Sequence, residues 1–305
     1  MDCEWCVMKY RKHREIFFYV ILLIAVLIIN GYELKLLQSE MLVRRICAQK
    51  IDYENLRNLQ LNSKILEKAD KKAEAFIKNN PGMKHVTCMN AIGYLTYCMM
   101  TSSYHPDEKH MADDHTFVRV VTRLSANPHF LEVYGYYKAI LGDLEYFPVP
   151  MVADEKADVS FRDSWYQPRT YGGDRKHEGC DIMASNNKRG YFPVVSITDG
   201  SIEKMGWLEQ GGYRIGVRSA SGGYFYYAHL DSYAPELKQG DFVIAGQLLG
   251  FMGDSGYGKE GTVGQFDVHL HLGIYVNKDQ GEMSVNPYWI LKILKNTRTK
   301  WQNVT

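Results

Sequence analysis

The sequence predicts an α+β multidomain protein with an N-terminal transmembrane helix, a helical accessory region and a mostly antiparallel β domain. Residues 16–32 form an apolar run without a charged side chain, and about 17 such residues are just enough to cross a membrane. Residues 33–147 are rich in helix formers and poor in glycine. By contrast, 21 of the 26 glycines lie between residues 172 and 281, among short aromatic runs that are typical of strands joined by turns.

The apolar run is predicted to be a membrane anchor that leaves the rest of the chain outside the cell. A basic tail, residues 1–15, precedes it, and the positive-inside rule places such a tail in the cytoplasm. A cleaved signal peptide is the alternative, but no A-x-A cleavage pattern follows the run. We therefore expect a single-pass protein of the cell membrane with an extracytoplasmic second half. The basic residues of the tail are Lys9, Arg11, Lys12 and Arg14.

Helices are expected throughout the accessory region 33–147. Apolar residues at three- and four-residue spacings predict an amphipathic helix or helical hairpin over 33–79, with a partner-binding coiled coil as the alternative. Further helices are expected over 85–100 and 128–141. The stretch 102–114 gathers histidines and carboxylates, but their spacing matches no definite metal site, so we expect a solvated polar loop.

A linker over 148–159 is predicted to join the helical region to the β domain, 160–289, which a C-terminal helix and tail follow, 290–305. Within the β domain, the dipeptide Asp199-Gly200 predicts a hairpin turn between two strands. The strands are expected at residues 192–197, 199–205, 213–218, 223–230, 241–244, 247–252 and 266–276.

The last of these strands carries two histidines on one face. Side chains alternate along a strand, so His269, His271 and Gly273 share one face, while Leu270 and the apolar residues in step with it face the core. Two imidazoles are thus held side by side on a rigid element. A half-buried strand whose polar face happens to carry two histidines remains the alternative.

A second pair of metal-capable residues lies about 90 residues earlier. His177 and Asp181 are four residues apart, but Gly179 between them argues against a helix, so we expect a loop that runs into a strand at Asp181. Catalytic zinc takes three protein ligands from histidines and carboxylates and leaves one position for water. The HxxxD spacing alone is common, so its weight depends on the fold between the two pairs.

Five runs in the second half form one ordered pattern. They are DSWYQPR from Asp163, GGDRKHEGCD from Gly172, YAHL from Tyr227, AGQLLGFMGDSG from Ala245, and HLHLG from His269. This ordered set of HxxxD, a central His and HxH resembles the M23 family of zinc metallopeptidases, also called the LytM or lysostaphin type. The resemblance covers roughly residues 160–289, about two fifths of the chain.

The resemblance implies an M23-type peptidase domain with a groove and one Zn²⁺ per chain. It assigns the metal ligands to His177, Asp181 and His271. It assigns catalytic roles, beside a zinc-activated water and the substrate carbonyl, to His229 and His269.

The function implied by the resemblance is that of a membrane-anchored bacterial zinc metalloendopeptidase. It would hydrolyse peptide bonds in peptidoglycan, in the stem or cross-bridge peptides. The alternatives are a catalytically silent M23-like scaffold or activator of cell-wall hydrolases, and a peptidase that acts on a secreted protein or peptide. Peptidoglycan peptides and the membrane are the expected partners, whereas a formal net charge of +1 does not suggest nucleic-acid binding.

Two features depart from this pattern or compete with it. Cys180 stands where the family usually carries an aliphatic residue, and in an extended segment it points away from Asp181 and into the core as a small apolar side chain. The run GDSG, from Gly253 to Gly256, matches the nucleophile motif of chymotrypsin-like serine proteases. It lies inside the M23 pattern, and we interpret it as a glycine turn between strands.

Overall fold

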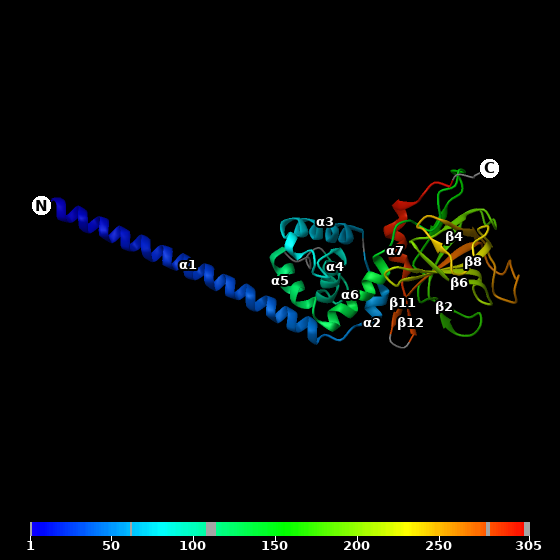
Figure 1. The fold of residues 1–305 in the computed structure, drawn as a ribbon, viewed down its shortest axis with the longest axis horizontal. Coiled ribbons are helices and arrows are strands. Elements are labelled where there is room, and N and C mark those ends of the chain that lie inside the picture. Colours follow the sequence, from blue (N-terminus) through cyan, green and yellow to red (C-terminus); the bar gives the residue numbers. More distant parts are fainter. Residues whose placement is uncertain (1, 62, 108–113, 279–280, 302–305) are drawn as a thin grey trace.

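The computed structural model describes residues 2–61, 63–107, 114–278 and 281–301. Three parts follow one another along its long axis: a long N-terminal helix whose C-terminal end packs on the next part, a cluster of helices, and a β domain (Figure 1). The expected α+β organisation is confirmed, with helices first and an antiparallel sheet after them.

The N-terminal helix α1 spans Asp2–Ala48 and is much longer than the predicted anchor 16–32. At 47 residues it extends for about 70 Å. Its apolar side chains from Ile16 to Tyr32 are exposed and contact no other part of the protein's core. The stretch His13–Ala48 is long and apolar enough to cross a membrane, and none of its most apolar window is buried. Exposed apolar surface of this extent requires a lipid or protein environment.

The helical region contains α2 at Tyr53–Asn58, α3 at Ser63–Asn79, η1 at Pro81–Met83, α4 at Ala91–Thr101, α5 at Asp114–Leu124 and α6 at Pro128–Leu141. The stretch 33–79 is therefore neither one helix nor a simple hairpin, since it holds the end of α1 followed by α2 and α3. The helix predicted over 128–141 has the observed bounds, because the side chain of Asn127 caps the backbone N–H of Phe130 and a proline follows the cap. Helix α4 begins later than predicted, where Asn90 supplies the cap.

Helix α5 was not predicted, although its apolar residues have helical spacing. Phe117, Val120, Val121 and Leu124 are all buried in the helical core. The ring of Phe117 contacts those of Phe76, Tyr94 and Tyr97. Of the expected polar loop over 102–114, residues 102–107 are described and include the buried Tyr104, whereas 108–113 lie outside the described residues, which resume where α5 begins.

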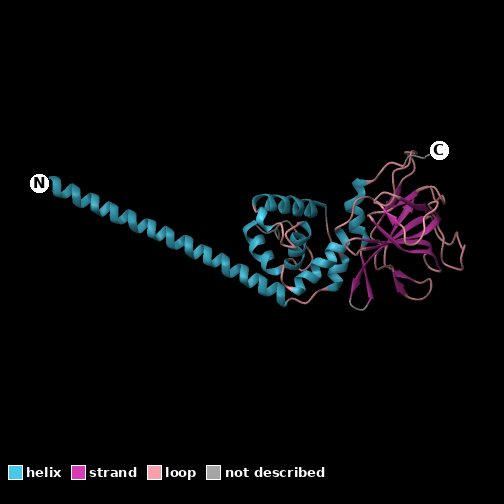
Figure 2. Ribbon diagram, viewed as in Figure 1, coloured by secondary structure: helices cyan, strands magenta, loops and turns pink. Residues whose placement is uncertain are grey.

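A ten-stranded sheet forms the β domain (Figure 2), and all its paired strands are antiparallel. Its main path runs β1-β4-β11-β8-β7-β6-β9. These strands are β1 Val159–Phe161, β4 Cys180–Ala184, β11 His269–Lys278, β8 Tyr224–Tyr233, β7 Gly212–Ser219, β6 Gly200–Leu208 and β9 Phe242–Val243. Off this path, β10 Leu248–Met252 pairs with β5 Pro193–Val195 and with β8, and β12 Gly281–Val285 pairs with β11. A separate two-stranded sheet joins β2 Pro168–Arg169 to β3 Arg175–Lys176.

The two faces of the central strands differ in chemistry. One face is apolar and fully buried, with Ile182 from β4, Leu270 and Leu272 from β11, and Ile215 and Val217 from β7. Residues that alternate with these line the opposite face, which carries histidines, tyrosines and charged side chains. As expected, Cys180 lies on the apolar face: it is fully buried, and burial raises the pKa of its thiol to about 12. It is therefore an inert core residue.

The hairpin predicted at Asp199-Gly200 is wrong. Gly200 is the first residue of β6, and β5 before it pairs with β10 and not with β6. Glycine is needed here because β6 and β7 lie very close together. A Cβ at Gly200 would collide with the carbonyl oxygen of Arg218 on β7. The actual hairpin joins β6 to β7 through residues 209–211.

The helical region packs directly on the β domain. Arg57 of α2 donates hydrogen bonds to the backbone and side-chain oxygens of Ser284 on β12, at 3.1 and 2.6 Å, and its own carbonyl accepts from the N–H of Asn286. Asp143, just after α6, accepts two hydrogen bonds from Ser221.

The stretch 148–159, expected as a linker, is partly packed against the β domain. Val149 is fully buried, and its carbonyl accepts a hydrogen bond from Arg298. The last residue of the stretch, Val159, already belongs to β1. At the C-terminus, α7 spans Pro287–Leu294 and is followed by η3, Lys295–Thr297, while the final four residues lie outside the described part.

Candidate active site

Strand register brings the two predicted pairs of metal-capable residues together. Asp181 on β4 lies directly opposite His271 on β11, and His271 lies opposite Ala228 on β8. These three residues form one row across the polar face of the sheet. Directly opposed residues of antiparallel strands have Cβ atoms about 5 Å apart, so the Asp181 and His271 side chains meet. A single strand pairing thus brings together two residues that are 90 positions apart in the sequence.

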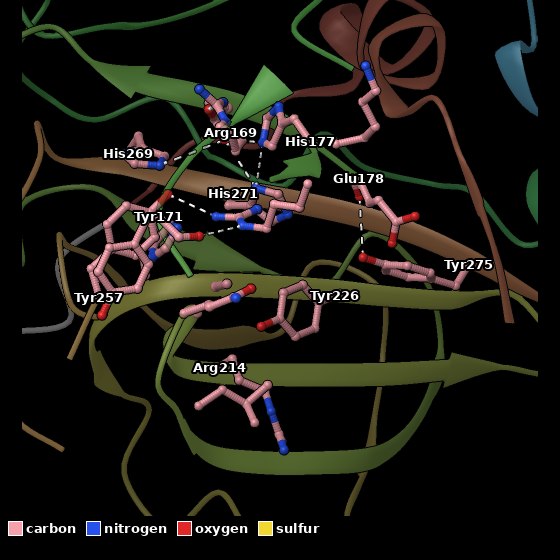
Figure 3. Close-up of a pocket in the computed structure, with 18 of the residues that line it drawn as sticks. Arg169, Tyr171, His177, Glu178, Arg214, Tyr226, Tyr257, His269, His271 and Tyr275 are labelled. Carbon is pink, nitrogen blue, oxygen red and sulfur yellow. Dashed lines mark hydrogen bonds and ion pairs between the residues drawn. The ribbon is translucent and has the colours of Figure 1, made fainter. Parts of the chain in front are cut away.

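His177 completes a group of three donor atoms from the loop that precedes β4. Its Nε2 lies 2.9 Å from Nδ1 of His271 and 3.0 Å from Oδ1 of Asp181. The last two atoms lie 3.1 Å apart. Figure 3 shows His177 and His271 turned toward each other above the strand. These three residues could hold a metal ion, with one ligand atom each.

The donor set fits a tetrahedral zinc ion. Bonds of about 2.0–2.1 Å from zinc to nitrogen and oxygen would put the ligand atoms about 3.3 Å apart, close to the separations found. Burial alone would raise the pKa of Asp181, but hydrogen bonding to His177 and His271 outweighs it and holds the pKa of this carboxyl well below its usual range. Asp181 is therefore an anion, and two imidazoles with one carboxylate form a typical catalytic zinc set.

Contacts behind the donor atoms fix their orientation. Nδ1 of His177 lies 2.8 Å from the carbonyl oxygen of Ser164. Because a carbonyl can only accept, Nδ1 carries a proton, and Nε2 is the atom that His177 presents to the centre. On the other side, Nη2 of Arg169 donates to Oδ2 of Asp181 at 2.6 Å, which leaves Oδ1 for the centre.

Gly179 makes room for the imidazole of His271. A Cβ at this position would lie 2.5 Å from Nε2 of His271, closer than real Cβ contacts allow. The glycine between His177 and Asp181 thus does more than prevent a helix, because it lets the His271 ring lie against the backbone of the preceding loop.

His229 reaches the same groove through a bulge in β8. Tyr213 of β7 pairs with Leu230, whereas Ile215 pairs with Tyr227, so Ala228 and His229 together oppose one residue of β7. The backbone of His229 has φ 61°, in the left-handed region that non-glycine residues rarely adopt. Bulges of this kind redirect a side chain, and they are frequent beside active sites.

The imidazole of His229 is anchored at one nitrogen. Its Nδ1 donates to the carbonyl oxygen of Ser255 at 2.8 Å, which leaves Nε2 with a lone pair. Burial, together with the neighbouring His269 and His271, lowers the pKa of His229 well below its usual value. His229 is therefore a neutral imidazole that can accept a proton.

His269 has the same kind of anchor. Its Nδ1 donates to the carbonyl oxygen of Asp267 at 2.6 Å, and its Nε2 lies 3.7 Å from Oδ1 of Asp181. The ring centroids of His229 and His269 are 4.8 Å apart. Two imidazoles with free Nε2 atoms thus lie beside the group formed by His177, Asp181 and His271.

All five predicted site residues line one groove of about 1080 Å³. The aromatic side chains of Tyr171 and Tyr257 also line it and stack face to face, with ring centroids 4.1 Å apart. Sequence reasoning assigned no role to Arg169 or to these tyrosines. Arg169 and Tyr171 lie in or beside the runs that carried the resemblance, but only strand pairing reveals that they reach the site.

The GDSG run has a structural role at Ser255. This serine is fully buried, its Oγ donates to the carbonyl oxygen of Leu230 at 2.6 Å, and it accepts from the N–H of Tyr213 at 3.0 Å. Its carbonyl holds His229, as described above. The hydroxyl is therefore committed to bridging β7 and β8 at the bulge, which agrees with the interpretation of this run as a turn.

An antiparallel sheet whose groove gathers two imidazoles and a carboxylate, with two further imidazoles beside them, is the arrangement expected of a metal-dependent hydrolase. The family described as Peptidase family M23 matches residues 175–287. A structure from Ruminococcus gnavus, assigned as a glycyl-glycine endopeptidase lytM, is 36% identical, with a TM-score of 0.67, over 85% of this chain and 98% of the other. The chain belongs to peptidase family M23.

Two characterised relatives match part of the chain. The L-Ala--D-Glu endopeptidase of Bacillus subtilis is 41% identical over 160 residues, 52% of this chain and 46% of that protein. Lysostaphin of Staphylococcus simulans is 34% identical over 118 residues, 38% of this chain and 21% of that protein. This chain therefore matches less than half the length of each.

The role of Gly179 can be tested by adding one methyl group. Gly179→Ala should displace the His271 imidazole and weaken metal binding by about 10–100-fold, the range seen when contacts behind a ligand are lost. Metal content after dialysis and affinity by competition with a chelator would measure this. Gly82→Ala is the control, because nothing lies within 4 Å of a Cβ there. Unchanged metal affinity in Gly179→Ala would contradict the steric argument.

Ser255→Ala should destabilise the fold without removing chemistry. It leaves a buried carbonyl and a buried N–H unpaired, which costs about 1–3 kcal/mol, measurable by denaturant unfolding. The activity of the folded variant should stay within a few-fold of wild type. Ser232→Ala, at an exposed position on β8, should change neither property. A stable but inactive Ser255→Ala variant would instead make the hydroxyl part of the reaction.

Proposed function

We propose that this protein is a zinc-dependent metalloendopeptidase that hydrolyses peptide bonds in peptidoglycan. The observation that carries the proposal is the convergence of His177, Asp181 and His271, with His229 and His269 beside them, in one groove. The substrate class is supported by the relatives, one of which is named for cleaving an L-Ala–D-Glu bond and another for cleaving glycyl-glycine bonds.

Three residues would hold the zinc ion in this proposal: His177 through Nε2, His271 through Nδ1, and Asp181 through Oδ1. When bound there, zinc supplies a Lewis acid that activates water and polarises a peptide carbonyl. Arg169 keeps Asp181 oriented by occupying Oδ2, and Ser164 keeps His177 in the tautomer that presents Nε2. One anionic and two neutral ligands leave the ion a net positive charge.

His229 and His269 would move protons and orient the reacting groups. Each has its Nδ1–H engaged by a backbone carbonyl, so each offers Nε2 to the groove. The low pKa of His229 keeps its Nε2 unprotonated at neutral pH, ready to take a proton from the attacking water. His229, once protonated, returns this proton to the leaving amine, and His269 orients the reacting groups.

We further propose that α1 anchors the enzyme in the cell membrane with its N-terminus in the cytoplasm. The exposed apolar stretch within His13–Ala48 supports the anchor, and the basic residues before it support the orientation. The peptidase domain would then face the cell wall, where its substrate lies. A signal sequence is the competing role for this helix.

Substitution of a metal ligand should remove zinc and activity together. His271→Ala and Asp181→Ala should each lose the bound ion, measured by elemental analysis, while circular dichroism remains close to that of wild type. The loss follows because two ligands cannot replace a three-ligand site at neutral pH. A zinc-loaded, fully active His271→Ala variant would remove the ligand assignment.

The matched contrast is His229→Ala, which should keep zinc. Its rate should fall by about 10²–10⁴-fold, the usual contribution of a general acid or base. Loss of the metal from this variant would mean that the ligand and catalytic histidines have been assigned wrongly.

Digestion of purified peptidoglycan by the full chain in detergent should release fragments with new free peptide ends. Mass spectrometry should detect these ends only without a chelator, and readdition of zinc should restore them. Zinc-loaded protein that releases no fragment would contradict the proposal and favour a scaffold or activator. Cleavage of secreted proteins but not of the wall polymer would point to a different substrate class.

A further inference from the structure

Arg214 is a groove cation without an ion-pair partner among the described residues. Arg214 lies on β7, opposite the bulge formed by Ala228 and His229. Its neighbours Ile215 and Val217 face the core, so Arg214 belongs to the polar face and lines the groove. Its Nη1 is shielded from solvent and has no hydrogen-bond partner in the part of the chain that the structure describes.

Two other arginines of the groove region, Arg169 and Arg218, have the acidic partners that Arg214 lacks. Arg169 is paired with Asp181 at 2.6 Å. Arg218, four residues further along β7, is paired with Glu203 at 2.6 Å and with Glu282 at 3.0 Å. Within the described residues, no carboxylate forms an ion pair with Arg214. The acidic groups at this end of the groove are thus committed to Arg218.

The tyrosines around Arg214 do not neutralise it. Its positive charge acts on the hydroxyls of Tyr224 and Tyr226, but burial dominates and raises the pKa of both, to about 12 for Tyr224. Both hydroxyls are therefore neutral at physiological pH. A partly buried guanidinium without an anion carries an uncompensated desolvation cost, which a bound anion would offset.

Arg214 lies within reach of a substrate at the metal centre. Between β11, which carries His271, and β7 there is only one strand, β8. Adjacent strands are about 4.8 Å apart, so the backbones of His271 and Arg214 are about 10 Å apart across the groove floor. In Figure 3, Tyr226 lies between the two residues. An extended peptide advances about 3.3 Å per residue, so about three residues of substrate cover this distance along the groove.

We propose that Arg214 binds a free carboxylate of the peptide substrate, one or two residues from the scissile bond. This inference rests on the proposed peptidase function and names its substrate class. The planar guanidinium can donate two parallel hydrogen bonds to a carboxylate, a geometry that lysine cannot reproduce. Arg214 is thus a specificity residue that touches substrate away from the reacting atoms.

The inference distinguishes between the two kinds of bond that appear in the names of relatives, L-Ala–D-Glu and glycyl-glycine. A glutamate residue within a peptide uses one carboxyl group to continue the chain and keeps the other free, beside an L-Ala–D-Glu bond. The interior of a glycine chain offers no carboxylate, and Arg214 would then remain unpaired. The geometry therefore favours a bond next to an acidic residue over a glycyl-glycine bond.

A pair of synthetic peptides tests the inference on the zinc-loaded full chain. One contains an L-Ala–D-Glu bond with the second carboxylate of D-Glu free, and the other carries a carboxamide there. Wild type should prefer the carboxylate peptide by about 10–100-fold in kcat/KM, as expected for charge-assisted hydrogen bonds. In Arg214→Met the two peptides should be cleaved at nearly equal rates, and Arg214→Lys should recover only part of the preference.

Two further measurements keep the test specific. Lys204→Gln removes a positive charge from an exposed residue on the rim of the same groove and should keep the preference. Arg214→Met should melt at or above the wild-type temperature, because it deletes an unpaired buried charge; a structural arginine would give a lower temperature.

The outcomes separate this inference from the proposed function. Equal cleavage of both peptides by wild type, or a preference that survives in Arg214→Met, overturns the role of Arg214 and leaves the peptidase function standing. No cleavage of either peptide or of peptidoglycan by zinc-loaded wild type overturns both. A preference present in wild type and lost in Arg214→Met supports the inference.

Discussion

The antiparallel pairing of β4 with β11 is the constraint on which the site depends. It places Asp181 opposite His271, and no local segment could hold the two together. A slip of one residue would turn His271 into the core and expose Leu270 or Leu272 to the groove. Both leucines and Ile182 are fully buried, so the apolar face fixes the register that the polar face uses. The same strand register therefore buries the apolar core and positions the donor atoms.

Irregular backbone in β8 aims the side chain of His229 where a regular strand would not. A continuous β8 would not bring His229 into the groove, and the bulge with its positive φ does so at some cost in backbone energy. Ser255 stabilises this arrangement, since its hydroxyl joins β7 to β8 and its carbonyl anchors the imidazole. The groove thus combines a rigid strand register with a strained His229, whose neighbours hold it in place.

The parts of the structure that could be predicted are those encoded by local periodicity. Alternation along 266–276 placed His269 and His271 on one face, and Pro128 with the apolar spacing after it gave the bounds of α6. Features that depend on distant strands could not be predicted. Asp199-Gly200 has the composition of a turn, yet Gly200 is needed because β7 approaches closely. Arg214 shows no local signal, since its lack of a partner depends on Arg218, which pairs with Glu203 on β6 and with Glu282 on β12.

The charges on the groove floor are arranged asymmetrically about the metal-capable centre. Arg169 lies on the β4 side and is neutralised by Asp181, whereas Arg214 lies on the β7 side without an anion. Of these two arginines, only Arg214 is open to a substrate carboxylate in the described part of the chain. If that carboxylate belongs to the residue after the scissile bond, the leaving amine must lie toward β7 and the acyl part toward β4. The direction in which the peptide chain crosses the groove is then set by the two arginines, because Arg169 already has a partner and Arg214 does not.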